Sequence, residues 1–149
     1  MTEDKNYTMN NEYKALDEAR LDILRKDGKL MLTEQQKQAV LTKGRVIVSA
    51  AAGSGKTSTM VKRIILMIAE GYSLRNMLVL VYNVAAADEL KERLHGELFD
   101  RACSEVGEAR ERFRKELDDL PFCHICTIHS FCNSLLRDNF DKLGLSPTF

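Results

Sequence analysis

Residues 49–58 read SAAAGSGKTS and contain the residue types that bind a phosphate group. Gly53 and Gly55 allow backbone angles, and a close approach to phosphate, that a side chain would block. Successive backbone N–H groups in such a loop point inward and form an anion-binding nest. The pattern therefore predicts that Lys56 reaches the β- and γ-phosphates of a nucleotide and that the Thr57 hydroxyl binds Mg²⁺.

The loop differs at one position from the usual pattern G-x-x-x-x-G-K-[ST], because Ala50 stands at the first glycine. That position ends a predicted strand and needs only a small residue if its backbone is not left-handed. We expect the change to be tolerated. The alternative is a chance Gly-Lys-Thr sequence at the start of a helix.

The segments on either side of the loop are those that a P-loop requires, a strand before it and a helix after it. Residues 45–50, RVIVSA, are rich in β-branched side chains and predict a strand. Residues 57–70 carry apolar side chains at helical spacing, and Gly71 ends the predicted helix. A shorter helix, to about residue 42, should precede the strand, because Thr33 and Gln36 form a capping box.

Strands alternate with helices in the rest of the chain, which predicts an α/β fold with a parallel sheet. Residues 77–82 are nearly all apolar, as in a strand that is buried on both faces. The pattern also predicts helices over 85–94 and 129–140, a strand over 122–128, and between them a charged helix or helix pair over 100–119, broken near Gly107, with a solvated face.

The N-terminal part differs in composition from the rest of the chain. Residues 1–9 should be disordered, and residues 11–26 have apolar side chains near one helical face, with Gly28 available to end that helix. We interpret 1–28 as a helical extension, either docked or solvated, and 29–149 as the nucleotide-binding domain.

The composition suits a globular protein of 149 residues, with 22 basic and 22 acidic side chains. This neutral balance gives no overall electrostatic footprint for nucleic acid, although it allows a local basic groove. No apolar run reaches the length of a membrane span, so we expect a cytoplasmic protein without a membrane partner. Its four cysteines, the first of which is Cys103, should be reduced.

The segment CHICTIHSFC, residues 123–132, raises the alternative of a zinc site. In a strand over 122–128, Cys123 and Cys126 would face opposite sides, whereas a zinc knuckle needs both on one tight turn. There is also no second C-x-x-C. We therefore interpret the cysteines as core residues.

Four segments, LTEQQKQAV, AAAGSGKT, MLVLVYNVAAADELKERL and CTIHSFC, resemble in this order four motifs at the start of a superfamily-one DNA helicase of the UvrD/Rep type. The similarity is closest to AddA-like helicase–nuclease subunits, and it covers about residues 30–149. It implies a P-loop NTPase (RecA-like) fold, with a parallel sheet flanked by helices, of which this chain is an incomplete N-terminal portion. It also implies ATP and Mg²⁺ as cofactors and DNA, single-stranded or a duplex end, as a partner, and a nuclease partner subunit could accompany the full-length protein.

The resemblance places Gln36 at the position that reads the adenine edge, for which an amide offers both a donor and an acceptor. From the residues alone, a capping glutamine is the favoured alternative. Arg63 matches an arginine that approaches the nucleotide. The predicted nucleotide-binding residues are Gln36, Ala52, Gly53, Ser54, Gly55, Lys56, Thr57, Ser58 and Arg63, with Lys56 and Thr57 as the catalytic pair.

The resemblance also implies DNA contacts. Tyr82 could stack on a base, or it could pack under the sheet at the end of its strand. Asn83 could bond a phosphate. Thr127 and His129 match a segment that touches the DNA backbone, whereas the alternative for His129 is local hydrogen bonding at a helix start. In the third motif, Val81–Ala85 lacks the two threonines and the second asparagine position of the usual form.

Hydrolysis of ATP also needs an acidic residue after a further strand, and residues 87–89 fall inside a helix pattern instead. We therefore expect the N-terminal ATP-binding portion of a helicase that couples ATP hydrolysis to translocation on DNA and its unwinding in recombination or repair. Alone it should bind nucleotide weakly and should not unwind DNA. The alternatives are a stand-alone P-loop protein, such as a small kinase or a nucleotide-binding regulator, and an inert remnant.

Overall fold

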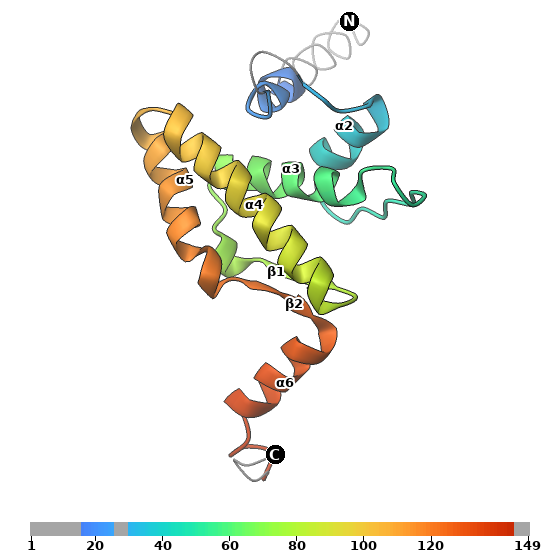
Figure 1. The fold of residues 1–149 in the computed structure, drawn as a ribbon, viewed down its shortest axis with the longest axis vertical. Coiled ribbons are helices and arrows are strands. Elements are labelled where there is room, and N and C mark those ends of the chain that lie inside the picture. Colours follow the sequence, from blue (N-terminus) through green and yellow to red (C-terminus); the bar gives the residue numbers. More distant parts are fainter. Residues whose placement is uncertain (1–15, 26–29, 145–149) are drawn as a thin grey trace, which may run out of the picture. The chain divides into compact units, whose positions relative to one another are not determined.

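The computed structural model of the protein describes residues 16–25 and 30–144. These form two compact units, Met1–Gly71 and Tyr72–Phe149, which are treated separately below (Figure 1). The predicted boundary near residue 28 and the disorder expected over 1–9 lie outside the described residues. Of the helix expected over 11–26, residues 16–22 are described and are helical.

Unit one contains α2, Glu34–Leu41, and α3, Lys56–Ala69, which pack on each other. The predicted capping box is confirmed: the Thr33 side chain accepts from the backbone N–H of Gln36, and the Gln36 side chain accepts from that of Thr33. α3 is amphipathic, with Ile65 and Ile68 fully buried, and it ends where predicted, before the left-handed Gly71.

The strand predicted over 45–50 is wrong. These residues form no strand, all are exposed, and the Ile47 side chain is 99% exposed. A strand exists only through hydrogen bonds to a neighbouring strand, and the sheet formed by the described residues consists of β1 and β2 of unit two alone. β-branched composition could not supply that missing partner.

Unit two begins with the short 3-10 helix η1, Leu74–Asn76, followed by β1, Leu78–Val81. The long helix α4, Val84–Ser104, and α5, Gly107–Asp119, form a hairpin. The short η2, Leu120–Phe122, then leads to β2, His124–Thr127, and α6, Ile128–Asp138. The two strands are parallel, as predicted, with Leu78 opposite His124 and Val81 opposite Thr127.

Only one face of this small sheet is covered. α4 packs on both strands, and the face carrying Ile125 and Thr127 is buried. On the other face, Leu78 is 47% and Leu80 41% exposed. The prediction that 77–82 is buried on both faces is therefore wrong, because among the described residues no helix lies on that second face.

The α4–α5 hairpin supplies the core of unit two. Leu90, Leu94 and Leu98 of α4 recur every four residues and are completely buried, and Phe113 of α5 is 2% exposed. Helical spacing of this kind places them along one stripe. The predicted break near Gly107 is confirmed, since α5 begins at this left-handed glycine.

A buried arginine lies inside the same hairpin. Arg101 of α4 stacks over the Phe113 ring, with 5.5 Å between its guanidinium carbon and the ring centroid. Burial lowers the pKa of Arg101, and the nearby carboxylate of Glu97 opposes this effect.

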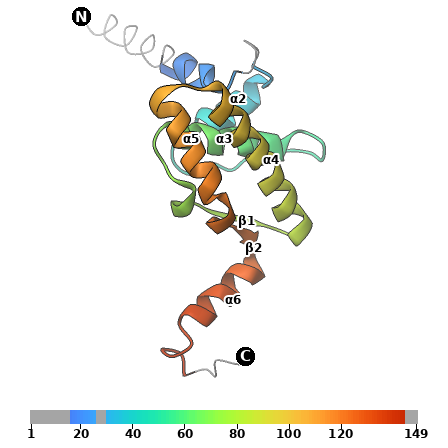
Figure 2. The ribbon, with the colours of Figure 1, turned by 60° about the vertical axis from the view of Figure 1, so that its left-hand side comes forward.

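α6 differs from the other helices because none of its residues is buried. In both views it runs from the end of β2 away from α4 and α5 (Figures 1 and 2). Ile128 and Leu135 leave apolar side chains on its surface.

The expectation of core cysteines is wrong. Cys103 and Cys132 are exposed, while Cys123 and Cys126 are half-buried, and all four are free thiols. Cys123 donates to the carbonyl of Leu120 at 2.9 Å, and burial raises the pKa of its thiol. Among the described residues, no three His, Cys, Asp or Glu side chains gather as metal ligands. Over the same residues, no helix is long and apolar enough to cross a membrane.

Glu116 provides a test of the packing of unit two. Its buried carboxylate on α5 accepts from the backbone N–H of Leu74 at 2.7 Å and from the Ser73 hydroxyl at 3.2 Å. Glu116→Ala leaves a buried donor without a partner, which should lower the free energy of unfolding by about 1–3 kcal/mol. Glu111→Ala, on the exposed side of the same helix, should change it by less than about 0.5 kcal/mol. Equal effects in urea titrations would contradict this role of Glu116.

Candidate functional site

The glycine loop of unit one ends in two left-handed residues. Gly53 has φ 76° and Gly55 has φ 81°, and Gly55 is the N-cap residue of α3. Gly55 provides no side-chain cap, and the first turn of α3 contains no acidic residue. The free N–H groups and the partial positive charge at this helix start suit an anion.

Lys56 lies beside this helix start and turns back onto the loop. Its Nζ donates to the carbonyl of Ala50 at 2.8 Å and to that of Ala51 at 2.7 Å. The ammonium group is therefore held over the loop by neutral acceptors. A phosphate oxygen would form a stronger, charge-assisted hydrogen bond with the same donor.

The other loop residues differ in exposure. Ala52 and Ser54 are exposed, whereas Thr57 and Ser58 are half-buried. Thr59 is buried, and its hydroxyl donates to the carbonyl of Gly55 at 2.9 Å, which fixes the entry into α3.

Gln36 joins α2 to the loop. Its Oε1 accepts from the backbone N–H of Thr33 at 2.9 Å, and its Nε2 donates to the carbonyl of Ser54 at 3.0 Å. A side-chain amide has two N–H donors and two acceptor lone pairs. One of each is used here, so one donor and one acceptor are left, and the capping and adenine-reading interpretations are compatible.

Arg63 connects the same two helices. Its Nη1 donates to the carbonyl of Ala39 in α2 at 2.5 Å, and the side chain lines the wall of a cavity. Sequence reasoning missed this bond, because nothing in the spacing of Arg63 indicates a carbonyl 24 residues away.

Two cavities of unit one surround these side chains. A cavity of about 420 Å³ is lined by Lys56, Thr57 and Arg63 together with the apolar side chains of Val46 and Val48. A second, of about 270 Å³, is lined by Gln36, Ser54 and Lys56. The structure thus brings the residue predicted for the base and the residue predicted for the phosphates to one cavity.

The four residues predicted to touch DNA lie together in unit two, at the carboxyl ends of the two parallel strands. Tyr82 and Asn83 follow β1, and Thr127 and His129 stand at the corresponding end of β2, because Val81 is opposite Thr127. Ligands of open α/β sheets bind at this edge. The Tyr82 side chain is 96% exposed, so it does not pack under the sheet.

Asn83 and Thr127 have capping roles here. Asn83 Oδ1 accepts from the N–H of Ala86 at 2.7 Å and starts α4. The buried Thr127 hydroxyl accepts from the N–H of Ser130 at 3.1 Å and starts α6. Two helix N-termini therefore begin at neighbouring strand ends, with the exposed His129 in the first turn of α6.

Comparison with known proteins assigns the family. The UvrD/REP helicase N-terminal domain family matches residues 32–149. The chain belongs to this family. The resemblance drawn from the sequence motifs is confirmed, and the matched region includes the loop, α2 and both strands.

Curated relatives share one name, which describes an ATP-dependent helicase/nuclease subunit. The protein of Pediococcus pentosaceus is 39% identical over 120 residues, and that of Thermoanaerobacter sp. strain X514 is 40% identical over 121 residues. Each alignment covers 78% of this chain and 10% of the relative. The protein of Clostridium acetobutylicum is 36% identical over 126 residues, which are 82% of this chain and 10% of that protein. This UvrD/REP domain chain therefore spans about a tenth of the length of the relatives it matches.

The close approach of Gln36 to Gly55 can be tested with two glycines of the same conformation. A Cβ at Gly55 would lie 2.9 Å from Gln36 Nε2, whereas a Cβ at Gly44, which also has φ 81°, would meet nothing within 4 Å. Gly55→Ala should therefore destabilise the chain more than Gly44→Ala, by about 1 kcal/mol for the displaced Gln36 hydrogen bonds. Urea titrations measure the difference, and equal losses would show that Gln36 moves aside without cost.

Proposed function

We propose that unit one binds ATP with Mg²⁺ as the nucleotide-binding part of a DNA helicase domain. The observation that carries the proposal is that Gln36 and Lys56 line one cavity beside the glycine loop. Membership of the UvrD/REP helicase N-terminal domain family supports the same conclusion.

The residues present fit the phosphates of a nucleotide. Backbone N–H groups of Gly53–Ser58 would surround them, and Lys56 would exchange the carbonyls of Ala50 and Ala51 for phosphate oxygens. The Thr57 hydroxyl would supply one Mg²⁺ ligand, and Mg²⁺ commonly takes its other ligands from substrate phosphates and water. Ala52, Ser54 and Ser58 would contribute through the backbone of the loop and the helix start.

Adenine would be read by Gln36. Its remaining N–H and lone pair match the acceptor N7 and the donor N6 of adenine, whereas guanine presents two acceptors, N7 and O6, on that edge. Arg63 would line the site from α3 while it holds α2 through Ala39.

The carboxyl edge of the sheet in unit two would bind single-stranded DNA. Tyr82 would stack on a base, and Asn83 would donate to phosphate through its Nδ2, since its Oδ1 caps α4. Thr127 would act by starting α6, so that its N–H groups and His129 face the DNA backbone.

For the whole protein, we propose an ATP-dependent DNA helicase of recombination and repair, acting in the cytoplasm with a nuclease activity attached or on a partner subunit. The relatives' names, which print helicase, nuclease and subunit, support this. The present chain alone should bind nucleotide and should not unwind DNA.

The first test is nucleotide binding, measured by titration of a fluorescent ATP analogue with Mg²⁺. Lys56→Ala should weaken binding at least tenfold, because the charge-assisted bonds to phosphate are lost. Gln36→Ala should lower the preference for ATP over GTP by about tenfold. Lys43→Ala, an exposed loop lysine, is the control and should bind as the wild type does. Binding that is unchanged in Lys56→Ala would contradict the assignment of the loop.

The second test concerns DNA. Tyr82 and Tyr72 are both exposed and flank β1 at opposite ends. Tyr82→Ala should weaken binding of a fluorescent oligothymidylate by about five- to 100-fold, because base stacking is lost. Tyr72→Ala is the matched control and should have no effect. Fluorescence anisotropy measures both, and equal affinities of the two variants would contradict a DNA site at the carboxyl edge.

A further inference from the structure

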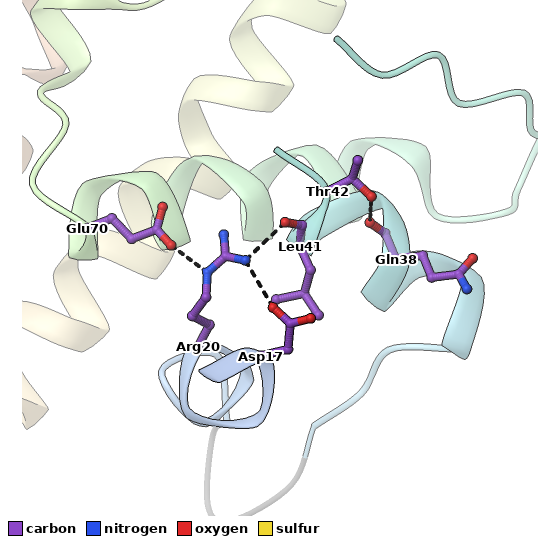
Figure 3. Close-up of polar contacts among 6 residues, drawn as sticks. All are labelled: Asp17, Arg20, Gln38, Leu41, Thr42 and Glu70. Atoms are coloured by element: carbon purple, nitrogen blue, oxygen red, sulfur yellow. Dashed lines mark hydrogen bonds and ion pairs between the residues drawn. The ribbon is translucent and has the colours of Figure 1, made fainter. Parts of the chain in front are cut away.

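The helical segment 16–22 precedes the region that matches the family, which begins at residue 32, and it contacts unit one through Arg20. The Arg20 side chain is only 12% exposed. Its Nε bonds Glu70 at 2.5 Å, and its Nη1 bonds the carbonyl of Leu41 at 3.0 Å and Asp17 at 3.3 Å (Figure 3).

Arg20 joins the ends of the two helices that carry the nucleotide site. Leu41 is the last residue of α2, and Glu70 is the C-cap residue of α3. The planar guanidinium group, with its five donors, can bond both ends at once. The segment is also packed rather than solvated, since Leu21 is 3% and Leu24 2% exposed.

α2 depends on such outside donors. The last carbonyls of a helix have no partner within the helix, and α2 has no basic residue in its last turn. Thr42 bonds the carbonyl of Gln38, Arg63 bonds that of Ala39, and Arg20 bonds that of Leu41. At the other end, Gln36 bonds the glycine loop through Ser54.

The short length of α2 links these two ends. Eight residues span only about 12 Å, so a tilt at Leu41 moves Gln36 with respect to the loop. We propose that Arg20 is a positioning residue of the nucleotide site, which fixes α2 against α3 so that Gln36 stays beside the loop. This inference rests on the proposed function of unit one.

The test compares Arg20→Gln with Arg25→Gln in the full chain. Arg25 lies in the same N-terminal segment, but it pairs only with Asp22 and Glu18 on the surface. Affinities are measured for magnesium ATP and for inorganic tripolyphosphate, which has no base. Arg20→Gln should weaken ATP binding about tenfold and leave tripolyphosphate binding within about twofold, because only the base contact is displaced. Arg25→Gln should change neither.

Two further variants separate positioning from general loss of structure. Arg20→Lys keeps one charged bond and should recover part of the ATP affinity, and Glu70→Gln should give an intermediate loss. A uniform destabilisation would lower both affinities in parallel. An unchanged ratio of ATP to tripolyphosphate affinity in Arg20→Gln, or the same change in Arg25→Gln, would overturn the proposal.

Hydrogen exchange of the α2 amides keeps this inference distinct from the proposed function. They should exchange faster in Arg20→Gln and at the wild-type rate in Arg25→Gln. Equal exchange in both variants would overturn the role of Arg20. If the wild-type chain bound no ATP, the proposed function would fail, while the exchange comparison would still decide whether Arg20 fixes α2.

Discussion

The arrangement of unit one depends on the side-chain amide of Gln36. This one group closes the capping box that starts α2 and bonds the carbonyl of Ser54 in the glycine loop. Because the peptide unit is planar and trans, fixing the Ser54 carbonyl also directs the N–H of Gly55 to the opposite side. A helix start, a loop conformation and the direction of a phosphate-binding donor are thus set together, and Gly55 must be a glycine because a Cβ would displace the amide.

Local features of the fold could be predicted from the sequence, whereas features that need a partner could not. The capping box of Thr33 and Gln36, the break at Gly107 and the two strands beginning at Leu78 and His124 follow from short-range patterns. Residues 45–50 show the limit, because β-branched side chains favour a strand but do not provide its neighbour. Leu80 shows it again, since an apolar run is typical of two buried faces and the structure covers one.

The candidate sites follow the same division. The glycines, Lys56 and Gln36 could be found because their types and spacing carry chemistry by themselves. The carbonyl partners of Arg63 and Arg20 could not, because they depend on how three helices pack. For Asn83 and Thr127, a signal was present: both are favoured N-cap residues directly before a helix. Their capping role explains how two helix N-termini come to adjacent strand ends beside the exposed Tyr82.

The central claim is that base and phosphate recognition meet at Gln36, and one measurement tests it most directly. In an NMR titration with magnesium ATP, the side-chain NH₂ resonances of Gln36 and the backbone N–H of Gly55 should shift together, with the same dissociation constant. Magnesium tripolyphosphate should shift Gly55 strongly and the Gln36 NH₂ group only weakly, because no base is present. Shifts at Gly55 without any at Gln36 on addition of ATP would contradict the account.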